Sequence, residues 1–421
     1  MLYRTMGKTG EEVSLLGFGA MRLPVDEDGA IDAEESVAMI RRAIDSGVNY
    51  LDTAFTYPKS EKILGEALKD GYREKVFIAD KLPAWLIRSE EDKESLFNKS
   101  FERLDVDTID FFLVHNLTKG NWKKTLKWDL INFLDQKKKE GKIRYLGFSF
   151  HDDLDLFKEI VDIYDWDFCQ IQLNFIDKDF QAGEQGLKYA ARRGMGIVIM
   201  EPLKGGRLTQ SIPPAVKEVW DTDDSGTTPV EWSFKWVASH PEVSVILSGM
   251  SSESQLNDNL YLFSDPDIEE ISDDGRRLLK AVTDKYRTLI KYDCTKCGYC
   301  MPCPQKIDIP TVLRHFNDWN AFDKPSNVKF EYTNWLGKHA SDCVDCHACE
   351  EKCPQKLPIS TAMKESKEQL IEINARLSEY PVTGKKLENE EDISSLFQDI
   401  DEAIHLTDYV NKLKEDGRIM T

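Results

Sequence analysis

The sequence predicts a closed α/β barrel followed by a smaller cysteine-rich domain. Through roughly the first 260 residues, short apolar runs alternate with longer stretches of helical periodicity. Near-continuous apolar strands that alternate with helices indicate a parallel sheet covered by helices. Eight such units in about 250 residues are typical of a (β/α)8 (TIM) barrel. Eight of the nine cysteines then fall in two tight clusters after residue 293.

The eight expected strands are apolar runs that share a similar length. They lie at residues 14–21, 48–54, 76–81, 110–116, 144–150, 168–174, 196–202 and 243–250. An open doubly wound sheet is the main alternative, but none of these runs is followed by G-x-G-x-x-G. The closed barrel is therefore favoured. Cys169, inside the sixth run, is expected to be a small buried side chain.

The composition changes around residues 265–292, where an acidic turn region leads into a probable helix. We expect the barrel to occupy residues 1–265 and a helical linker to occupy residues 266–292. The cysteine-rich domain is expected over residues 293–365, and a C-terminal helical segment over residues 366–421.

The charge and the cysteine spacing limit the classes of partner and compartment. With 75 acidic and 55 basic residues, the formal net charge of −20 disfavours binding to nucleic acid or to an anionic membrane surface. No apolar run approaches the roughly 20 residues that cross a bilayer, and the start, MLYRTMGKTGEEVS, lacks the apolar core of a signal peptide. The short cysteine spacing favours metal binding in a reducing compartment. We therefore expect a cytoplasmic protein.

Polar side chains follow three successive expected strands, where a barrel places its active site. Asp52 and Tyr57 follow the second strand, Lys81 ends the third, and His115 lies in the fourth. Lys81 near Tyr57 would favour the phenolate and lower the tyrosine's pKa, with Asp52 pairing Lys81. Tyr57 is then a candidate proton donor to a substrate oxygen near neutral pH.

These motifs together resemble the aldo-keto reductase family. They are Asp52-Thr-Ala-x-x-Tyr57 with Ser60-Glu61-x-x-Leu-Gly65, then Lys81-Leu-Pro, Leu113-Val-His115 and the run GKIRYLGFS that ends at Ser149. The resemblance implies a catalytic tetrad of Asp52, Tyr57, Lys81 and His115. Tyr57 would protonate a carbonyl while a nicotinamide supplies hydride, and His115 would orient the carbonyl oxygen.

The resemblance also implies cofactor contacts along the chain. Ser149 and Gln170 match positions that hold the nicotinamide amide, and Met200 falls where many relatives have a stacking tyrosine. Phe150 stands where many relatives have Asn. The matched phosphate and adenosine contacts are Lys204, Gly205, Gly249, Ser251, Gln255 and Asn259. Relatives that choose NADPH usually carry Lys or Arg near the adenosine for its 2′-phosphate. Residues 248–259 contain neither, which favours NADH over NADPH as the cofactor.

The two cysteine runs have the spacing of iron–sulfur proteins. They read Cys294-x2-Cys297-x2-Cys300-x2-Cys303-Pro304 and Cys343-x2-Cys346-x2-Cys349-x3-Cys353-Pro354. Three thiolates of a run bind one [4Fe–4S] cluster while the fourth binds the neighbouring cluster. We therefore assign cluster 1 to Cys294, Cys297, Cys300 and Cys353, and cluster 2 to Cys343, Cys346, Cys349 and Cys303. Zinc is the alternative, but it does not explain three-and-one spacing with Cys-Pro twice. His347 is expected to face solvent.

The whole chain resembles a branch of aldo-keto reductases with a C-terminal, mainly α-helical, ferredoxin-like domain that holds two clusters. This implies an enzyme that reduces a small carbonyl substrate, or oxidises an alcohol, with NADH or NADPH. Its clusters would exchange electrons with a redox partner such as ferredoxin or flavodoxin, or sense redox state. The alternative is an electron-transfer protein whose barrel binds a flavin or a partner. A structural role for the clusters also remains open.

Overall fold

The computed structural model describes residues 1–26, 30–57, 59–210, 212–294, 299–322, 340–353 and 355–377, with side chains of the last helix described as far as Gln369. These residues form two compact units. The first comprises Met1–Gly205 with Val230–Gly275, and the second comprises Gly206–Pro229 with the residues from Arg276 onward. None of the described helices is both long enough and apolar enough to cross a membrane.

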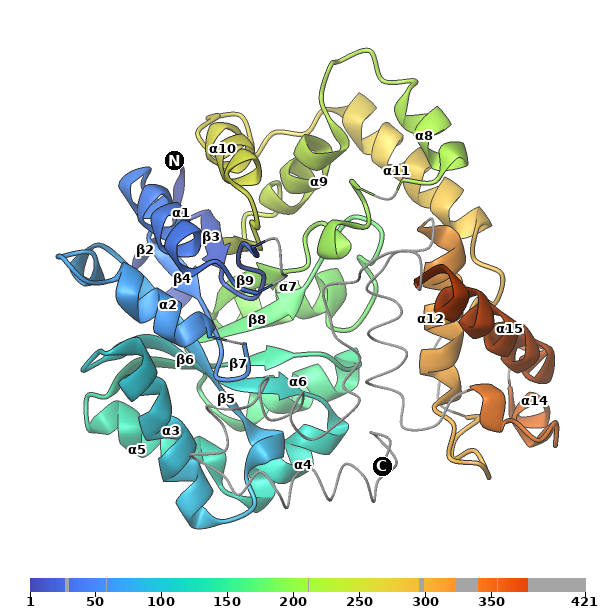
Figure 1. Ribbon diagram of the computed structural model, residues 1–421, viewed down its shortest axis with the longest axis horizontal. Helices are drawn as coiled ribbons and strands as arrows, with labels where there is room; N and C mark the ends of the chain where they lie inside the picture. The colour runs from blue at the N-terminus through green and yellow to red at the C-terminus, as the bar shows by residue number, and fades with distance from the viewer. Residues whose placement is uncertain are drawn as a thin grey trace. The chain divides into compact units, whose positions relative to one another are not determined.

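The first unit is built on a closed barrel of parallel strands (Figure 1). Its strands are β3 (Leu16–Gly19), β4 (Tyr50–Asp52), β5 (Phe77–Pro83), β6 (Ile109–Leu117), β7 (Ile143–Phe150), β8 (Phe168–Gln172), β9 (Gly196–Met200) and β10 (Val245–Ser248). They pair in chain order, and β10 closes the ring against β3. Each of the eight expected runs overlaps one of these strands, which confirms the (β/α)8 fold.

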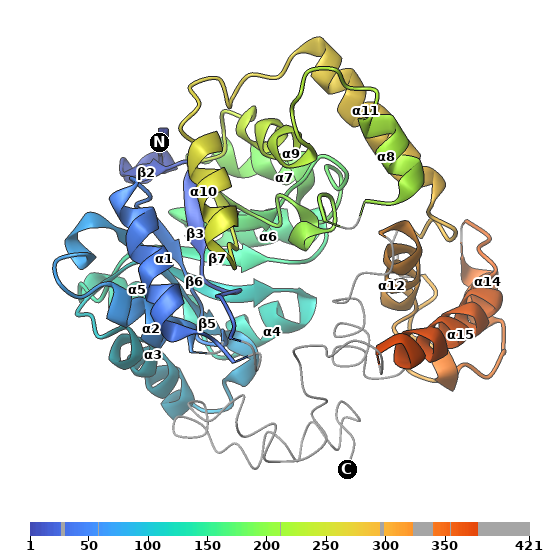
Figure 2. The same ribbon diagram turned by 45° about the horizontal axis from the view of Figure 1, so that its top comes forward.

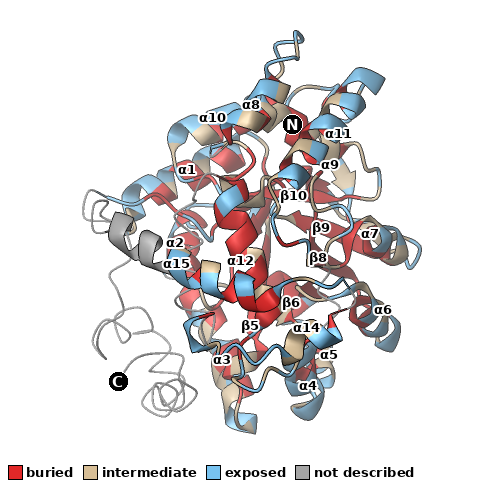
Figure 3. Ribbon diagram, turned by 90° about the vertical axis from the view of Figure 1, so that its right-hand side faces the viewer, coloured by how far each residue is buried: buried red, intermediate tan, exposed pale blue. Residues whose placement is uncertain are grey.

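Helices surround the barrel strands, which are largely buried (Figure 3). They are α1 (Ala33–Asp45), α2 (Ser60–Ala67), α3 (Glu90–Leu104), α4 (Lys119–Lys127), α5 (Leu130–Lys139), α6 (Leu154–Ile163), α7 (Gly183–Ala191), α9 (Pro229–Ala238) and α10 (Glu253–Leu262). Short 3-10 turns are η1 (Gly7–Thr9), η2 (Arg73–Lys75), η3 (Ala84–Leu86) and η4 (Lys204–Gly206). Polar caps fix several helix starts. The Asp32 side chain accepts from Glu35 N at α1, and Ser89 and Asp92 form a capping box at α3.

An N-terminal hairpin that the sequence did not predict covers the start of the barrel. Its strands β1 (Tyr3–Thr5) and β2 (Glu12–Ser14) pair antiparallel. Met6 and Val13 are fully buried among barrel residues that include Tyr50 and Phe168, each the first residue of its strand. The interior of the barrel at its N-terminal end is therefore filled by apolar side chains.

The second unit is helical and carries the cysteines. Its elements are α8 (Pro214–Trp220), α11 (Asp273–Thr288, which begins in the first unit), α12 (Ile309–Ala321), η5 (Ala340–Asp342), α14 (Ala348–Lys352) and α15 (Ile359–Leu377). Helix α12 packs against α15, and α8 runs beside α11 in both Figures 1 and 2. A buried ion pair of 2.8 Å between Arg207 and Asp318 joins the segment 206–229 to α12. The sequence analysis did not assign this segment to the cysteine domain.

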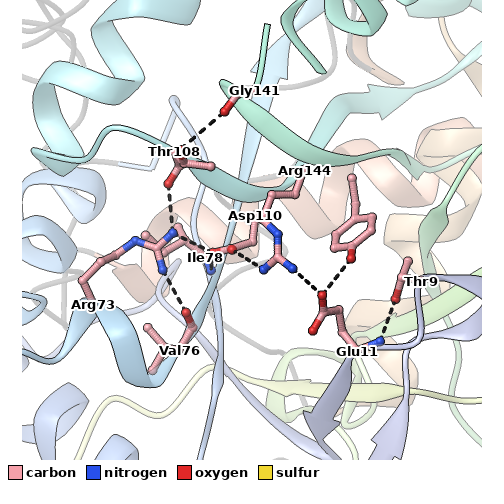
Figure 4. Close-up of polar contacts among 10 residues, drawn as sticks. Thr9, Glu11, Arg73, Val76, Ile78, Thr108, Asp110, Gly141 and Arg144 are labelled. Atoms are coloured by element: carbon pink, nitrogen blue, oxygen red, sulfur yellow. Dashed lines mark hydrogen bonds and ion pairs between the residues drawn. The ribbon is translucent and has the colours of Figure 1, made fainter. Parts of the chain in front are cut away.

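A network of charged side chains ties the hairpin to the starts of three barrel strands (Figure 4). Asp110 of β6 is almost fully buried. Its carboxylate accepts from Arg73 at 2.8 Å, Arg144 at 3.0 Å and Ile78 N at 2.9 Å. Arg144 also pairs with Glu11 of the hairpin turn, which accepts from the Tyr145 hydroxyl at 2.7 Å. The Asp110 carboxylate thus links the starts of β5, β6 and β7.

Replacing Asp110→Asn should destabilise the barrel without affecting the opposite end. The amide has one acceptor oxygen instead of two and carries no charge, so two half-exposed arginines lose part of their pairing. We expect the free energy of unfolding to fall by about 1–3 kcal/mol, seen as a lower midpoint of thermal denaturation. Glu66→Gln, which removes an exposed pair with Lys69, should leave the midpoint nearly unchanged. Equal midpoints for Asp110→Asn and wild type would contradict this account.

Candidate functional site

The four candidate catalytic residues lie at the carboxyl ends of neighbouring strands. Asp52 is the last residue of β4, and Tyr57 lies on the turn that follows it. Lys81 lies in β5 and His115 lies in β6. His115 is opposite Pro83, so it lies two residues closer to the carboxyl end of the barrel than Lys81 does. The barrel therefore brings these residues to one mouth, as the sequence predicted.

Lys81 is fully buried at the centre of this group. Its Nζ donates to Asp52 Oδ1 at 2.6 Å and to the Thr53 carbonyl oxygen at 2.6 Å. The same nitrogen lies 5.2 Å from the centroid of the Tyr57 ring. Burial lowers the pKa of Lys81, but Asp52 and Tyr57 outweigh burial and raise this pKa above its ordinary value. Lys81 is therefore a fixed cation beside Tyr57 across the ordinary pH range.

The pKa of Tyr57 corrects one expectation from the sequence. Burial raises this pKa, the charge of Lys81 lowers it, and the net pKa lies above the ordinary value of a tyrosine. The predicted direction of the Lys81 effect is correct, but the predicted net lowering is wrong because burial is the larger effect. Tyr57 is consequently a protonated phenol at neutral pH, which is the form that donates a proton.

His115 faces Tyr57 as a neutral ring. Its ring centroid lies 6.0 Å from that of Tyr57, edge to face, and 5.0 Å from that of Trp85. Burial and the nearby Lys81 charge hold the pKa of His115 well below its usual range. Its Nδ1 has no hydrogen-bond partner among the described residues. A neutral imidazole can donate a ring N–H to a carbonyl oxygen, and its lowered pKa makes it too weak a base to take the phenol's proton.

Ser149 and Gln170 lie opposite each other on β7 and β8. Ser149 Oγ accepts from Asn116 N at 2.7 Å. Gln170 Nε2 donates to the Met200 sulfur at 3.8 Å, while its buried Oε1 has no partner within the described residues. Phe150 instead packs against Phe157 of the surrounding helix α6, with 5.2 Å between the ring centroids. The unmatched amide oxygen of Gln170 suits the N–H of a nicotinamide carboxamide, so these residues fit that cofactor.

The candidate phosphate loop is the η4 turn. Lys204 Nζ pairs with Asp177 at 2.5 Å, and Asp177 also accepts from Gln172 Nε2 at 3.0 Å. Gly205 has φ of 66°, a conformation that favours glycine. Arg22, on the loop after β3, donates to the Gly205 carbonyl oxygen at 3.2 Å. The sequence analysis missed Arg22, although its place three residues after a strand end was a usable signal.

The candidate adenosine segment begins where β10 ends. Ser252 caps α10, and the Gln255 side-chain oxygen accepts from Ser251 N at 2.9 Å. Asn259 is buried and donates to Ser248 Oγ at 2.8 Å. Gly249 lies beside the loop that carries Arg22, since a Cβ added there would be 3.9 Å from Arg22 Cβ. The expected residues therefore share one loop and helix start, with a neutral glutamine where relatives place a cation.

The cysteines of the two runs share one hydrophobic core in the second unit. Cys300 and Cys353 are buried in it together with residues such as Tyr292, Ile307 and Ile359. Cys294, Cys303, Cys343 and Cys349 are partly buried and pack against this core, while Cys346 is exposed. Cys297 lies outside the described residues. In crossed ligation, each run supplies one cysteine to the cluster of the other run, which requires both runs to contact one core. Soft thiolate donors under apolar cover also fit iron–sulfur clusters.

The exact pairing of ligands with each cluster stays a prediction. Within the described part of the chain, no three His, Cys, Asp or Glu side chains lie close enough together to hold one ion. His347 is exposed and its Nδ1 lies 2.8 Å from Glu350 Oε2, as expected for a residue that faces solvent. Cys169 is fully buried in β8, as predicted, and burial raises the pKa of its thiol.

The aromatic residues near the mouth differ in what they contact. Trp85 lies against His115 and borders the site. Trp122 is buried, and its Nε1 donates to Glu159 at 2.8 Å, so it packs within the helical layer. The sequence could not tell these two tryptophans apart.

Comparisons with known proteins agree with the geometry. The model of the aldo/keto reductase family matches residues 15–273, and that of the 4Fe-4S dicluster domain matches residues 293–357. L-galactose dehydrogenase of Arabidopsis thaliana is 28% identical, with 61% of this chain and 86% of the plant protein covered. The NADH-specific methylglyoxal reductase of Escherichia coli is 24% identical, with 61% and 91% covered. The solved structure of an aldo-keto reductase from Bacillus halodurans shares the fold, with a TM-score of 0.56, 22% identity, and 67% of this chain and 96% of that chain covered.

Proposed function

Because the chain belongs to the aldo/keto reductase family and carries a 4Fe-4S dicluster domain, we propose that it is a nicotinamide-dependent oxidoreductase that reduces a small carbonyl substrate or oxidises the corresponding alcohol. The observation that carries the proposal is the buried Lys81, held by Asp52 and Thr53 beside the ring of Tyr57. A bound nicotinamide supplies hydride. The residues of the barrel mouth do the rest of the chemistry.

Each residue of the tetrad has a distinct part in this proposal. Tyr57 gives its phenol proton to the substrate oxygen as that oxygen gains negative charge. Lys81 stabilises the phenolate that remains, and Asp52 keeps Lys81 in place and charged. His115, neutral because of its lowered pKa, orients the substrate oxygen toward Tyr57. Ser149 and Gln170 would hold the carboxamide of the nicotinamide.

NADH is the proposed electron donor. The adenosine segment, residues 248–259, contains no Lys or Arg, and Gln255 is engaged with Ser251. A 2′-phosphate would thus find no cation in that segment. Arg22, near the Gly205 turn, is available to the pyrophosphate that both cofactors share. The NADH-specific relative of Escherichia coli supports the same choice.

The proposed role of the two clusters is electron exchange with a redox partner, such as ferredoxin or flavodoxin, or redox sensing. Hydride carries two electrons, whereas each cluster passes one at a time.

An alternative function follows from Met200, which stands where many relatives stack a tyrosine on the nicotinamide. In this alternative the barrel would bind a flavin, and carbonyl reduction would be minor. We propose that the protein works in the cytoplasm, because closely spaced cysteines favour metal binding in a reducing compartment.

Replacing Tyr57→Phe should abolish carbonyl reduction while the fold and the clusters persist. The change removes only the proton donor, so we expect kcat to fall by at least about 100-fold, with the cluster absorbance unchanged. The assay is anaerobic oxidation of NADH by a panel of aldehydes, with Trp122→Phe as a control in the helical layer. Undiminished turnover by Tyr57→Phe would remove Tyr57 from its proposed role.

The cofactor preference can be shifted at Gln255. Wild type should use NADH with the higher kcat/KM, and Gln255→Arg should raise kcat/KM for NADPH by about tenfold, because the 2′-phosphate gains a charged donor. Gln255→Met also loses the Ser251 contact but adds no charge, so it should not improve NADPH use. A wild-type preference for NADPH would show that a cation outside this segment reads the phosphate.

Crossed ligation makes a distinctive prediction for serine variants of the cysteines. Cys353→Ser and Cys294→Ser should perturb the same cluster, whereas Cys349→Ser should perturb the other one. Electron paramagnetic resonance of the reduced proteins distinguishes the two clusters, and wild type should contain about eight iron and eight sulfide ions per chain. If Cys353→Ser instead matches Cys349→Ser, each run ligates its own cluster.

A further inference from the structure

A buried ion pair lies behind the turn that carries Tyr57. Glu61, in the first turn of α2, pairs with Arg103, in the last turn of α3, at 2.7 Å, and both side chains are about fully enclosed. Ser100 Oγ donates to the other Glu61 oxygen at 2.6 Å. The sequence analysis used Glu61 only as part of a motif and gave it no role. Nothing in the proposed chemistry uses this pair directly.

Arg103 reaches past Glu61 to the catalytic turn itself. Its Nη1 donates to the Phe55 carbonyl oxygen at 3.2 Å, two residues before Tyr57. The guanidinium carbon also lies 4.2 Å from the centroid of the Phe55 ring. The Nε and Nη2 groups of Arg103 have no hydrogen-bond partner among the described residues. One nitrogen, Nη1, therefore connects Glu61 to the backbone of the Tyr57 turn.

Backbone bonds also hold the turn, because Phe55 N donates to the Lys81 carbonyl oxygen at 3.4 Å and Tyr57 N donates to the Ala54 carbonyl oxygen at 2.9 Å. Thr53 and Ser60 are joined through their hydroxyl groups at 2.7 Å, and the Thr53 carbonyl oxygen accepts from Lys81. Helix α2 starts after Lys59, which has φ of 55° and provides no side-chain cap. The start of this helix is thus not fixed by local capping. Phe55 is therefore held from two sides, by the backbone of β5 through its N–H and by the Arg103 side chain of α3 through its carbonyl oxygen.

We infer that Arg103, held by Glu61, is a positioning residue that keeps the hydroxyl of Tyr57 at the place where it meets the substrate oxygen. The inference rests on the proposed function of Tyr57. A misplacement of about 1 Å in a reacting group can cost on the order of 100-fold in rate. A loss of the Phe55 contact is therefore expected to reduce kcat even though Arg103 touches neither substrate nor cofactor.

A purely structural role, packing α2 on α3, is the competing explanation, and a matched control separates the two. Glu61→Gln and Asp110→Asn each replace a buried carboxylate that pairs with arginine in the same barrel. Asp110 lies at the opposite end of the barrel from Tyr57 and belongs to the network of Figure 4. Both variants should lower the thermal midpoint, so stability loss alone affects them alike. Only Glu61→Gln should also lower kcat, because only Glu61 holds the arginine that contacts the turn of Tyr57.

The experiment measures kcat, KM for NADH and the thermal midpoint for Glu61→Gln, Arg103→Lys and Asp110→Asn in the full chain with its clusters. We expect kcat to fall about 10- to 100-fold in the first two variants, with KM for NADH unchanged, and to stay at the wild-type value in Asp110→Asn. Arg103→Lys keeps a cation for Glu61, but its side chain is one bond shorter than the path to Nη1 and lacks the guanidinium that lies on the Phe55 ring. It therefore serves as the second test if Glu61→Gln does not fold.

Wild-type kcat in Arg103→Lys or Glu61→Gln, or an equal loss in Asp110→Asn, would overturn the inference. A separate measurement covers the case in which the wild type reduces no carbonyl, so that the proposed function itself fails. Alkaline absorbance titration of each protein, minus that of its Tyr57→Phe counterpart, reports the ionisation of Tyr57 alone. Loosening of the turn should admit water and move the pKa of Tyr57 down toward its ordinary value, because burial raises it. An unshifted titration in Arg103→Lys would count against the positioning role.

Discussion

The burial of the Lys81 ammonium group is the constraint on which the rest of the barrel mouth depends. An ion removed from water costs several kcal/mol unless close partners compensate. Here Asp52 and the Thr53 carbonyl provide that compensation, each at 2.6 Å. Their contacts require β4 and β5 to stay in the observed register, with Asp52 opposite Ala79. They also draw the turn after β4 back over the mouth, which places Tyr57 beside the cation.

The same burial determines which proton moves. The half-buried phenol of Tyr57 keeps its proton at neutral pH, because desolvation raises its pKa more than Lys81 lowers it. A buried histidine beside that cation stays uncharged. The mouth therefore holds a protonated phenol beside a neutral imidazole, and the proposed division of roles between them follows from their environment. In the second unit, the cysteine core is suited to iron–sulfur clusters, which carry one electron at a time.

The sequence predicted the features that depend on local pattern. All eight strands followed from near-continuous apolar runs, and the meeting of Asp52, Tyr57, Lys81 and His115 at one mouth followed from their places near strand ends in a barrel. The hairpin of residues 3–14 was missed because its strands are only three residues long. Arg22 and the pair of Glu61 with Arg103 were missed because their partners are distant in sequence. The net pKa of Tyr57 was predicted wrongly because its burial depends on the folded turn, and the helices expected beyond residue 377 lie outside the described residues.

The central claim is that hydride passes directly from nicotinamide to a carbonyl carbon within the barrel. The most direct test is to follow deuterium from NADH labelled at C4 during reduction of an aldehyde by the anaerobic, cluster-containing protein. The account predicts one deuterium on the new carbinol carbon for each labelled hydride consumed. Loss of the label to water, with the same amount of alcohol formed, would contradict it, because the electrons would then have passed through a flavin or the clusters.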